Sequence, residues 1–363
     1  MVRMFAKTLT KGYPIYLVDG GLDKTAELWQ EQRKEGKVVI VTDTNVGGLY
    51  LERAWESFSR AGIQTSAITI EAGEKSKSLG EAARLYAKLF EHRTRRRDAI
   101  CALGGGVVGD LAGFLAATYM RGIGLIHVPT TLLSQVDSSI GGKVGVNITL
   151  AKNYVGCFYQ PDMVVSDPRL LKSLPAEQIV EGLAEVIKYA LLSSDEFLSS
   201  LERNYGMFLA ADLTVLEPAI RTCINYKTNV VFEDEQDFGR RAVLNLGHTV
   251  GHALEAAGKY KKYSHGQAVG LGLLVATRLS SEIFDLSTEC HDRVKVLLKN
   301  IGLPTSINDI DTDRVVKAIS SDKKADDFSV NMVLLRGVGS PVINCNVDAA
   351  AIKNAVERLT ERV

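Results

Sequence analysis

Three of the six histidines lie in one short stretch of the chain that also holds an arginine and an asparagine. The segment RAVLNLGHTVGH contains Arg241, Asn245, His248 and His252, and His265 follows it. Because His248 and His252 stand four residues apart, a helix would project both imidazoles from the same face. Imidazoles are common ligands of transition metals, so the pattern predicts a metal site that needs one more ligand. The alternative is that one or two of them are ordinary core or surface histidines.

The charge and composition are those of an ordinary globular enzyme. The 363 residues include 43 Lys and Arg against 43 Asp and Glu, with 46% hydrophobic and 24% charged residues. A net charge of zero provides no general attraction for nucleic acid or for an anionic membrane. The one basic cluster, HRTRRR at 92–97, follows a helical pattern and is interpreted as a solvated helix end. We therefore expect neither nucleic acid nor a membrane as a partner.

The cysteines and the first residues indicate a cytoplasmic protein. Five cysteines are scattered along the chain without a CxxC pair, which suits small apolar thiols in a reducing compartment. The opening MVRMFAKTLTKGYP lacks the apolar stretch of a secretory signal. No uncharged apolar run approaches membrane-spanning length.

Two domains are expected, because 363 residues are many for one hydrophobic core. In residues 1–176, short β-branched runs alternate with amphipathic helices, which predicts an α/β domain with a mostly parallel sheet. The expected strands are Pro14–Val18, Lys37–Thr42, Gln64–Ile70, Ala99–Leu103, Gly124–Val128 and Met163–Ser166, and the expected helices Leu22–Glu35, Leu51–Ala61 and Leu79–His92.

Residues 177–363 have a mainly helical pattern, interrupted by one late hairpin around 330–335 and 342–345. The expected helices are Glu177–Leu192, Leu213–Val231, His248–Gly258, Gly266–Phe284 and Cys290–Asn300, with one more at the end of the chain. Ligands are expected in a cleft between the two domains.

A glycine-rich turn in the first half is typical of nucleotide binding. The apolar run Ala99–Leu103 leads into GGGVVGD, a GxGxxG pattern made by Gly104, Gly106 and Gly109. Glycine lets a backbone N–H approach a diphosphate closely, and the strand before and helix after supply the expected context. Asp43, at the end of another strand, suits ribose hydroxyls, so a dinucleotide is the preferred interpretation and a simple tight turn the alternative.

Five longer motifs occur in order along the chain, namely GGGVVGDLAGF, YMRGIGLIHVPTTLLSQVDSSIGGKVGVN, AKNYVGCFYQP, GLAEVIKYA and LNLGHTVGHALE. Taken together, they closely resemble the family of 3-dehydroquinate synthase, the second enzyme of the shikimate pathway, and the match runs from about Thr42 to Lys324. The resemblance implies a dehydroquinate synthase-like fold, with a Rossmann-like NAD-binding domain and a helical metal- and substrate-binding domain. It also implies a homodimer.

The implied reaction converts 3-deoxy-D-arabino-heptulosonate 7-phosphate into 3-dehydroquinate and phosphate. Transient oxidation by NAD is followed by phosphate elimination, re-reduction, ring opening and intramolecular aldol closure. The implied cofactors are NAD and Zn²⁺, with Co²⁺ as a possible substitute. The family pattern makes Glu185, His248 and His265 the metal ligands, whereas spacing alone nominates His252 beside His248. We follow the family, since its motifs also place Glu185 in GLAEVIKYA and His265 in SHGQAV.

The resemblance also assigns the residues that contact substrate and NAD. The catalytic set is Lys188, Lys227, Arg241, Asn245, His252 and Asp137. Further substrate contacts are Arg121, from the same or a second subunit, Lys143, Lys152, Asn153, Lys323 and Lys324. The NAD site comprises Asp43, Asn45, Glu74, Lys75, Lys77, Gly105, Gly106, Val107, Val108, Gly109, Asp110, Thr130, Thr131, Lys143, Lys152, Leu170 and Ser173.

Several alternatives stay open on the sequence. Asp110 and Asp137 could equally cap helices. Asp237 stands where the family has glutamate, so its role is undecided, and Ser173 replaces the usual threonine. Related sugar phosphate cyclases share the same chemistry; an aminodehydroquinate synthase is the nearest alternative, and a metal-dependent alcohol dehydrogenase is a more distant one.

Overall fold

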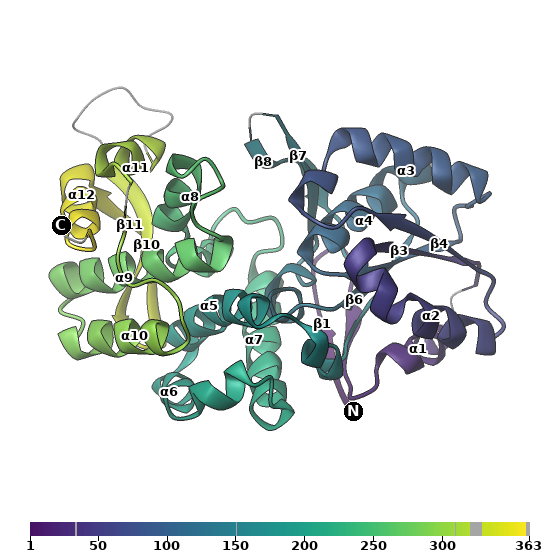
Figure 1. Ribbon diagram of the computed structural model, residues 1–363, viewed down its shortest axis with the longest axis horizontal. Coiled ribbons are helices and arrows are strands. Elements are labelled where there is room, and N and C mark those ends of the chain that lie inside the picture. The colour runs from purple at the N-terminus through teal and green to yellow at the C-terminus, as the bar shows by residue number, and fades with distance from the viewer. Residues whose placement is uncertain (33–34, 150, 309, 320–328, 361–363) are drawn as a thin grey trace. The chain divides into compact units, whose positions relative to one another are not determined.

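The computed structural model describes residues 1–32, 35–149, 151–308, 310–319 and 329–360. The chain divides into two compact units (Figure 1): unit 1 is Met1–Leu174 with Leu216–Gln236, and unit 2 is Pro175–Val215 with Asp237–Val363. The sequence-based division between residues 176 and 177 therefore differs from the structure at 216–236, most of helix α7 (Leu213–Glu233). This segment belongs with unit 1 because its Lys227 and Glu235 bond to residues of that unit. The ligands assigned to each half stay a prediction.

Unit 1 is built on a seven-stranded sheet in the order β1-β2-β9-β6-β5-β3-β4. Every neighbouring pair is parallel except β1 with β2. The strands are β1 (Val2–Ala6), β2 (Tyr13–Leu17), β3 (Val38–Asp43), β4 (Thr65–Ile70), β5 (Ala99–Gly104), β6 (Gly124–Pro129) and β9 (Met163–Ser166). The mostly parallel sheet predicted from the sequence is thus confirmed. Strand β1 at its edge was not predicted, and neither was the separate hairpin of β7 (Lys143–Ile148) and β8 (Ala151–Phe158).

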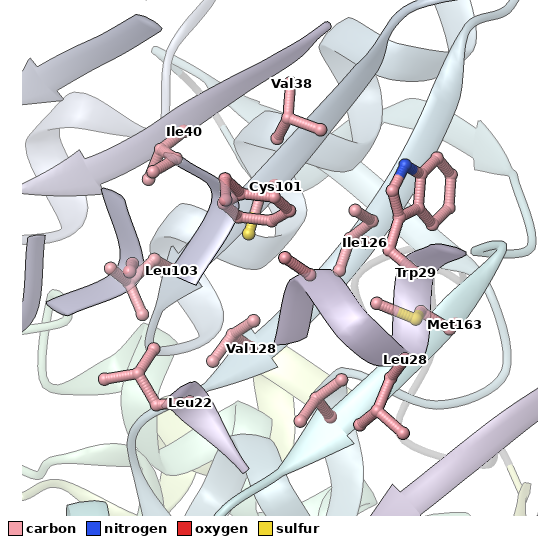
Figure 2. Packing of buried hydrophobic residues seen from close by; sticks show 14 of the residues in the cluster. Leu22, Leu28, Trp29, Val38, Ile40, Cys101, Leu103, Ile126, Val128 and Met163 are labelled. Atoms are coloured by element: carbon pink, nitrogen blue, oxygen red, sulfur yellow. The ribbon is translucent and has the colours of Figure 1, made fainter. Parts of the chain in front are cut away.

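Alternating residues of the central strands serve two separate cores, one on each face of the sheet. On β3, Val38 and Ile40 pack against helices α1 (Thr25–Glu31) and α2 (Thr44–Arg60), around the buried Trp29 (Figure 2). Val39 and Val41 face the opposite way, against α3 (Leu79–Glu91) and α4 (Gly106–Thr118). Burial on both faces explains why these strands are continuous apolar runs, and it holds the loops at their carboxyl ends on a rigid base.

Short helices of three to six residues complete unit 1. They are η1 (Leu22–Lys24), η2 (Glu74–Ser76), η3 (Tyr119–Arg121), the π-turn η4 (Ser134–Ser138) and η5 (Pro168–Ser173). The helix expected over 22–35 is observed as η1 and α1, ending at Glu31, and residues 33 and 34 lie outside the described part of the chain. The helix expected from Leu51 begins earlier, at Thr44, where Asp43 accepts from the first backbone N–H groups.

Unit 2 is mainly helical, as the sequence predicts, with one antiparallel hairpin. Its elements are α5 (Ala176–Ser193), α6 (Asp195–Leu209), η6 (Arg240–Asn245), α8 (His248–Ala257), α9 (His265–Phe284), α10 (Thr288–Asn300), α11 (Thr312–Ile319), β10 (Ser329–Gly337), β11 (Ser340–Asp348) and α12 (Ala349–Glu357). Among the described residues, no helix combines the length and the apolar character needed to cross a bilayer.

Two glycines allow α8 and α9 to pack closely (Figure 1). Gly247, just before α8, has a left-handed φ of 78°, and a Cβ there would lie 2.9 Å from the backbone nitrogen of Leu273. A Cβ on Gly272 of α9 would lie only 1.9 Å from the carbonyl oxygen of Gly247. Both positions therefore require glycine, and the close approach brings the first residues of the two helices, His248 and His265, near each other.

Candidate metal centre and nucleotide site

A carboxylate and two imidazoles from three different helices of unit 2 converge. Oε1 of Glu185, on α5, lies 3.3 Å from Nε2 of His248 and 3.2 Å from Nε2 of His265. Two ligands bound tetrahedrally at about 2.1 Å from a zinc ion stand about 3.4 Å apart. The donor spacing therefore fits a single divalent ion, and three protein ligands leave a position open for substrate.

Hydrogen bonds on the far side of each imidazole orient its Nε2. Nδ1 of His248 lies 3.1 Å from the carbonyl oxygen of Leu246, and Nδ1 of His265 lies 3.5 Å from Oε2 of Glu255. A proton on Nδ1 leaves the Nε2 lone pair available for an ion, as is usual for metal-binding histidines. Ser264 and Gln267 form a capping box that begins α9 at His265 and so places this side chain.

The electrostatics of the cluster favour added positive charge. Burial alone would raise the pKa of Glu185, but the ammonium of Lys188 and the imidazole of His248 hold that pKa well below its usual range. Burial opposes a charge on His265, yet hydrogen bonds to Glu185 and Glu255 raise its pKa to about 10. A divalent cation would satisfy the same carboxylates in place of that proton.

His252 belongs to a neighbouring group rather than to the one around Glu185. Its ring centroid lies 5.3 Å from that of His248. One ring nitrogen of His252, one carboxylate oxygen of Glu255 and one ring nitrogen of His265 lie within 4.8 Å of one another. Desolvation, followed by the charge on His248, lowers the pKa of His252 to about 4. The grouping of Glu185, His248 and His265 agrees with the family pattern and not with spacing alone, because the third helix, α9, supplies the second imidazole.

Sequence reasoning missed Glu255, whose carboxylate meets His265. It stands seven residues after His248 and three after His252, so its spacing puts it on the same face of α8. That spacing was the available signal.

Other predicted substrate residues of unit 2 lie close in sequence to the candidate metal ligands. Nζ of Lys188 lies 2.5 Å from Oε2 of Glu185, one turn away on α5, so the predicted shared face is observed. Arg241 is buried and Asn245 exposed, both on η6, which leads directly into α8. Lys323 and Lys324 fall outside the described residues.

In unit 1, the predicted nucleotide residues gather at the carboxyl ends of adjacent parallel strands. β5 ends at Gly104, β6 at Pro129 and β3 at Asp43, in neighbouring positions of the sheet. Gly105 precedes α4, and no described side chain caps that helix, so its first N–H groups are available to a phosphate. The hydroxyl of Thr130 is buried and has no partner among the described residues. A diphosphate with ribose hydroxyls fits these donors and acceptors.

Several of the predicted NAD contacts also have structural partners. Oδ1 of Asp43 accepts from Asn45 and Val46 at the start of α2, and Tyr50 bonds to Ser173 at 2.5 Å. Nζ of Lys77 lies 2.5 Å from Oδ2 of Asp110, which sits inside α4. Asp110 is therefore an ion-pair partner, and the alternative that it caps a helix is wrong.

The remaining predicted residues lie mainly on short helices, at the start of α4 and on the small hairpin. Asp137 pairs with Lys227 at 2.8 Å and does not cap a helix. Glu74 accepts from Asn147 of β7, and Lys143, Lys152 and Asn153 lie on the strands of that hairpin. The other predicted contacts are Gly106, Val107, Val108 and Gly109 at the start of α4, Lys75, Arg121 and Leu170 on the short helices η2, η3 and η5, and Thr131 just after β6.

Comparison with known proteins agrees with this arrangement. The family models for the 3-dehydroquinate synthase N-terminal and C-terminal regions match residues 67–181 and 182–325. The 3-dehydroquinate synthase of Desulforamulus reducens is 45% identical over 343 residues, covering 94% of this chain and 96% of that one.

Solved structures show the same fold. A 2-deoxy-scyllo-inosose synthase complexed with carbaglucose-6-phosphate, NAD+ and Co²⁺ superposes with a TM-score of 0.89 at 27% identity, covering 98% of this chain and 100% of that one. A 2-epi-5-epi-valiolone synthase from Streptomyces hygroscopicus with NAD+ and Zn²⁺ bound has a TM-score of 0.86 at 23% identity, covering 96% of each chain. The resemblance seen in the sequence is confirmed, and the chain belongs to the 3-dehydroquinate synthase family.

Proposed function

We propose that this protein is an NAD- and zinc-dependent 3-dehydroquinate synthase. It converts 3-deoxy-D-arabino-heptulosonate 7-phosphate to 3-dehydroquinate and phosphate with no net redox change. The single observation that carries the proposal is the convergence of Glu185, His248 and His265 in a chain of this family. Zn²⁺ fits the mixed nitrogen and oxygen donors, and Co²⁺ is a reasonable substitute.

The two cofactors supply chemistry that side chains lack: when bound, NAD takes up and returns a hydride, and the divalent ion acts as a Lewis acid toward substrate hydroxyls. The glycine turn at Gly105 and the N-terminus of α4 would hold the diphosphate of NAD. Thr130 would donate to, or accept from, the same nucleotide. Glu185, His248 and His265 would hold the ion and leave a coordination position for substrate oxygens.

Cationic and polar side chains would bind the acidic substrate, since the neutral chain must concentrate positive charge locally. Arg241, a planar guanidinium that is 2% exposed, suits a phosphate or carboxylate. Lys188 is held by Glu185, and Lys227 by Asp137. These ion pairs fix the ammonium groups before substrate arrives, which reduces the ordering required for catalysis. His252, whose ring lies 5.3 Å from the ring of His248, would exchange a proton with a substrate hydroxyl.

The test is incubation of the protein with the heptulosonate phosphate, NAD and Zn²⁺. Release of phosphate together with dehydroquinate, without lasting NADH absorbance, is the expected result. A metal-dependent alcohol dehydrogenase would instead accumulate NADH in proportion to product. Replacing the substrate by glucose 6-phosphate, or by the amino analogue of the heptulosonate, separates the other cyclase activities. A folded, metal-loaded protein that forms neither phosphate nor dehydroquinate would refute the proposal.

We extend the proposal to a homodimer, which the family resemblance implies, and to a location in the cytoplasm, which the scattered cysteines without a CxxC pair favour. Light scattering of the purified protein should give twice the 39.5 kDa chain mass. A protein that is monomeric by light scattering and still converts the substrate would contradict the proposed dimer.

A further inference from the structure

Glu255 lies on the outer side of the candidate metal centre. Its side chain projects from α8, is 7% exposed, and places Oε2 3.5 Å from Nδ1 of His265 on α9. His265 offers its other nitrogen, Nε2, to the group around Glu185 at 3.2 Å. The three groups thus form a chain in which one imidazole connects two carboxylates.

We infer that Glu255 is a positioning residue for the metal centre, which holds the tautomer and ring orientation of His265 so that Nε2 faces the ion. Metal-bound histidines usually donate their second N–H to a carboxylate, a carbonyl oxygen or water, and this raises their strength as ligands. When an ion binds Nε2, the proton on Nδ1 becomes a better donor, and the contact with Glu255 should shorten from its present length, which is long for a hydrogen bond.

The two histidine ligands are supported differently. His248 is oriented by a neutral acceptor, the carbonyl oxygen of Leu246, which its own chain supplies two residues away. His265 depends on a charged side chain from another helix. Glu255 therefore makes His265 the more electron-rich of the two imidazoles, and it makes this ligand sensitive to a substitution that leaves the three ligands unchanged.

The charges near the ion are consistent with this role. Glu185 and Glu255 contribute two negative charges, and Lys188 one positive charge. A divalent ion brings these four groups to a net charge of +1, whereas loss of the Glu255 charge would bring them to +2. A buried site binds a cation more weakly as its own positive charge rises.

This inference rests on the divalent metal of the proposed function, but metal binding can be measured without substrate or NAD. The apoprotein is prepared with a chelator, and Zn²⁺ affinity is measured by competition with a coloured chelator. We expect Glu255→Ala to weaken Zn²⁺ binding about 10- to 100-fold. Glu255→Gln, whose amide oxygen can still accept from Nδ1, should lose less affinity than Glu255→Ala.

Glu202→Gln is the matched control. Glu202 is another carboxylate of unit 2, with a side chain that is 27% exposed, but it accepts from Arg293 at 2.8 Å and not from an imidazole. It should lose stability in urea without losing Zn²⁺ affinity. The Co²⁺-loaded proteins give a second readout, because a turned or less basic His265 changes the visible absorption of the ion and a general loss of stability does not.

The inference is overturned if folded Glu255→Ala binds Zn²⁺ as tightly as Glu202→Gln and has an unchanged Co²⁺ spectrum. It is also overturned if wild type binds two ions per chain and both Glu255→Ala and His252→Ala lose one. That result would make His252, Glu255 and His265 a second metal site, since their donor atoms also lie within 4.8 Å of one another. Wild-type protein that binds no ion would overturn this inference and the zinc dependence together.

Discussion

Lys188 and Glu185 form an ion pair one helical turn apart on α5, with Nζ 2.5 Å from Oε2 and side-chain exposures of 1% and 0%. A buried charge without a partner is costly, so each of these residues protects the other in the absence of ligand. The pair also keeps Oε1 of Glu185 directed at the two imidazoles.

Replacing Lys188 by a neutral side chain should therefore destabilise the metal-free protein more than the metal-loaded one. We expect Lys188→Met to lower the free energy of unfolding of the apoprotein by about 3–5 kcal/mol, the usual cost of breaking a buried ion pair. Bound Zn²⁺ should reduce this loss, because the ion compensates Glu185. Urea unfolding with and without Zn²⁺ measures both values. The double variant Glu185→Gln/Lys188→Met is the control and should recover much of the apoprotein stability; equal losses in both forms would contradict the pairing.

The second prediction separates the two histidine assignments. His248→Ala and His265→Ala should each fail to retain Zn²⁺ after dialysis and should lose turnover, because two protein ligands hold a catalytic zinc poorly. His252→Ala should keep its metal while losing activity. Metal content by elemental analysis decides the matter. Zinc retained by His265→Ala and lost from His252→Ala would favour the spacing-based pair of His248 and His252 over the grouping seen in the structure.

The third prediction concerns the contact of α8 with α9. Gly272→Ala would place a methyl group 1.9 Å from the carbonyl oxygen of Gly247, so the helices must separate. We expect a loss of about 1–3 kcal/mol in the free energy of unfolding, as for an overpacked core, together with weaker Zn²⁺ binding. Gly206→Ala, in α6, is the matched control: its added methyl group meets no atom within 4 Å. That variant should gain about 0.5–1 kcal/mol. Similar effects at the two positions would count against the close packing.

The fourth prediction concerns pH and the buried His127 of β6. Burial lowers the pKa of His127 from 6.5 to about 4, so the folded protein keeps this imidazole neutral. An unfolded chain binds a proton at pH 6.5, which means that this group favours unfolding as the pH falls from 6.5 toward 4. At about 1.4 kcal/mol per pH unit, protonation of this group in the unfolded chain should lower the free energy of unfolding near pH 4.5 by an amount on the order of 3 kcal/mol.

Urea unfolding between pH 4.5 and pH 7.5 should show this loss in wild type and a flatter profile in His127→Leu, which has no proton to bind. Zinc should be absent from both samples, so that the metal ligands contribute equally. Parallel profiles for the two proteins would show that His127 does not titrate in this range.

Local patterns in the sequence were enough to predict the sheet and most helices. Val38 to Val41 are apolar on both faces of the strand, which is a direct consequence of helices covering both sides of a parallel sheet. The glycine turn after β5 was equally recognisable, because the strand before it and the helix after it are local. Strand β1 and the β7–β8 hairpin carried no comparable apolar pattern, since many of their residues are exposed.

The sequence by itself determined which side chains of each helix share a face: His248, His252 and Glu255 on α8, and Glu185 with Lys188 on α5. Tertiary structure decided which of them meet. Spacing reports on one helix only, whereas the candidate metal centre takes donors from three helices, and their meeting depends on the glycine contact between α8 and α9. The same holds for 216–236, which joins unit 1 through Lys227 and Glu235, because contacts distant in sequence leave no periodic signal.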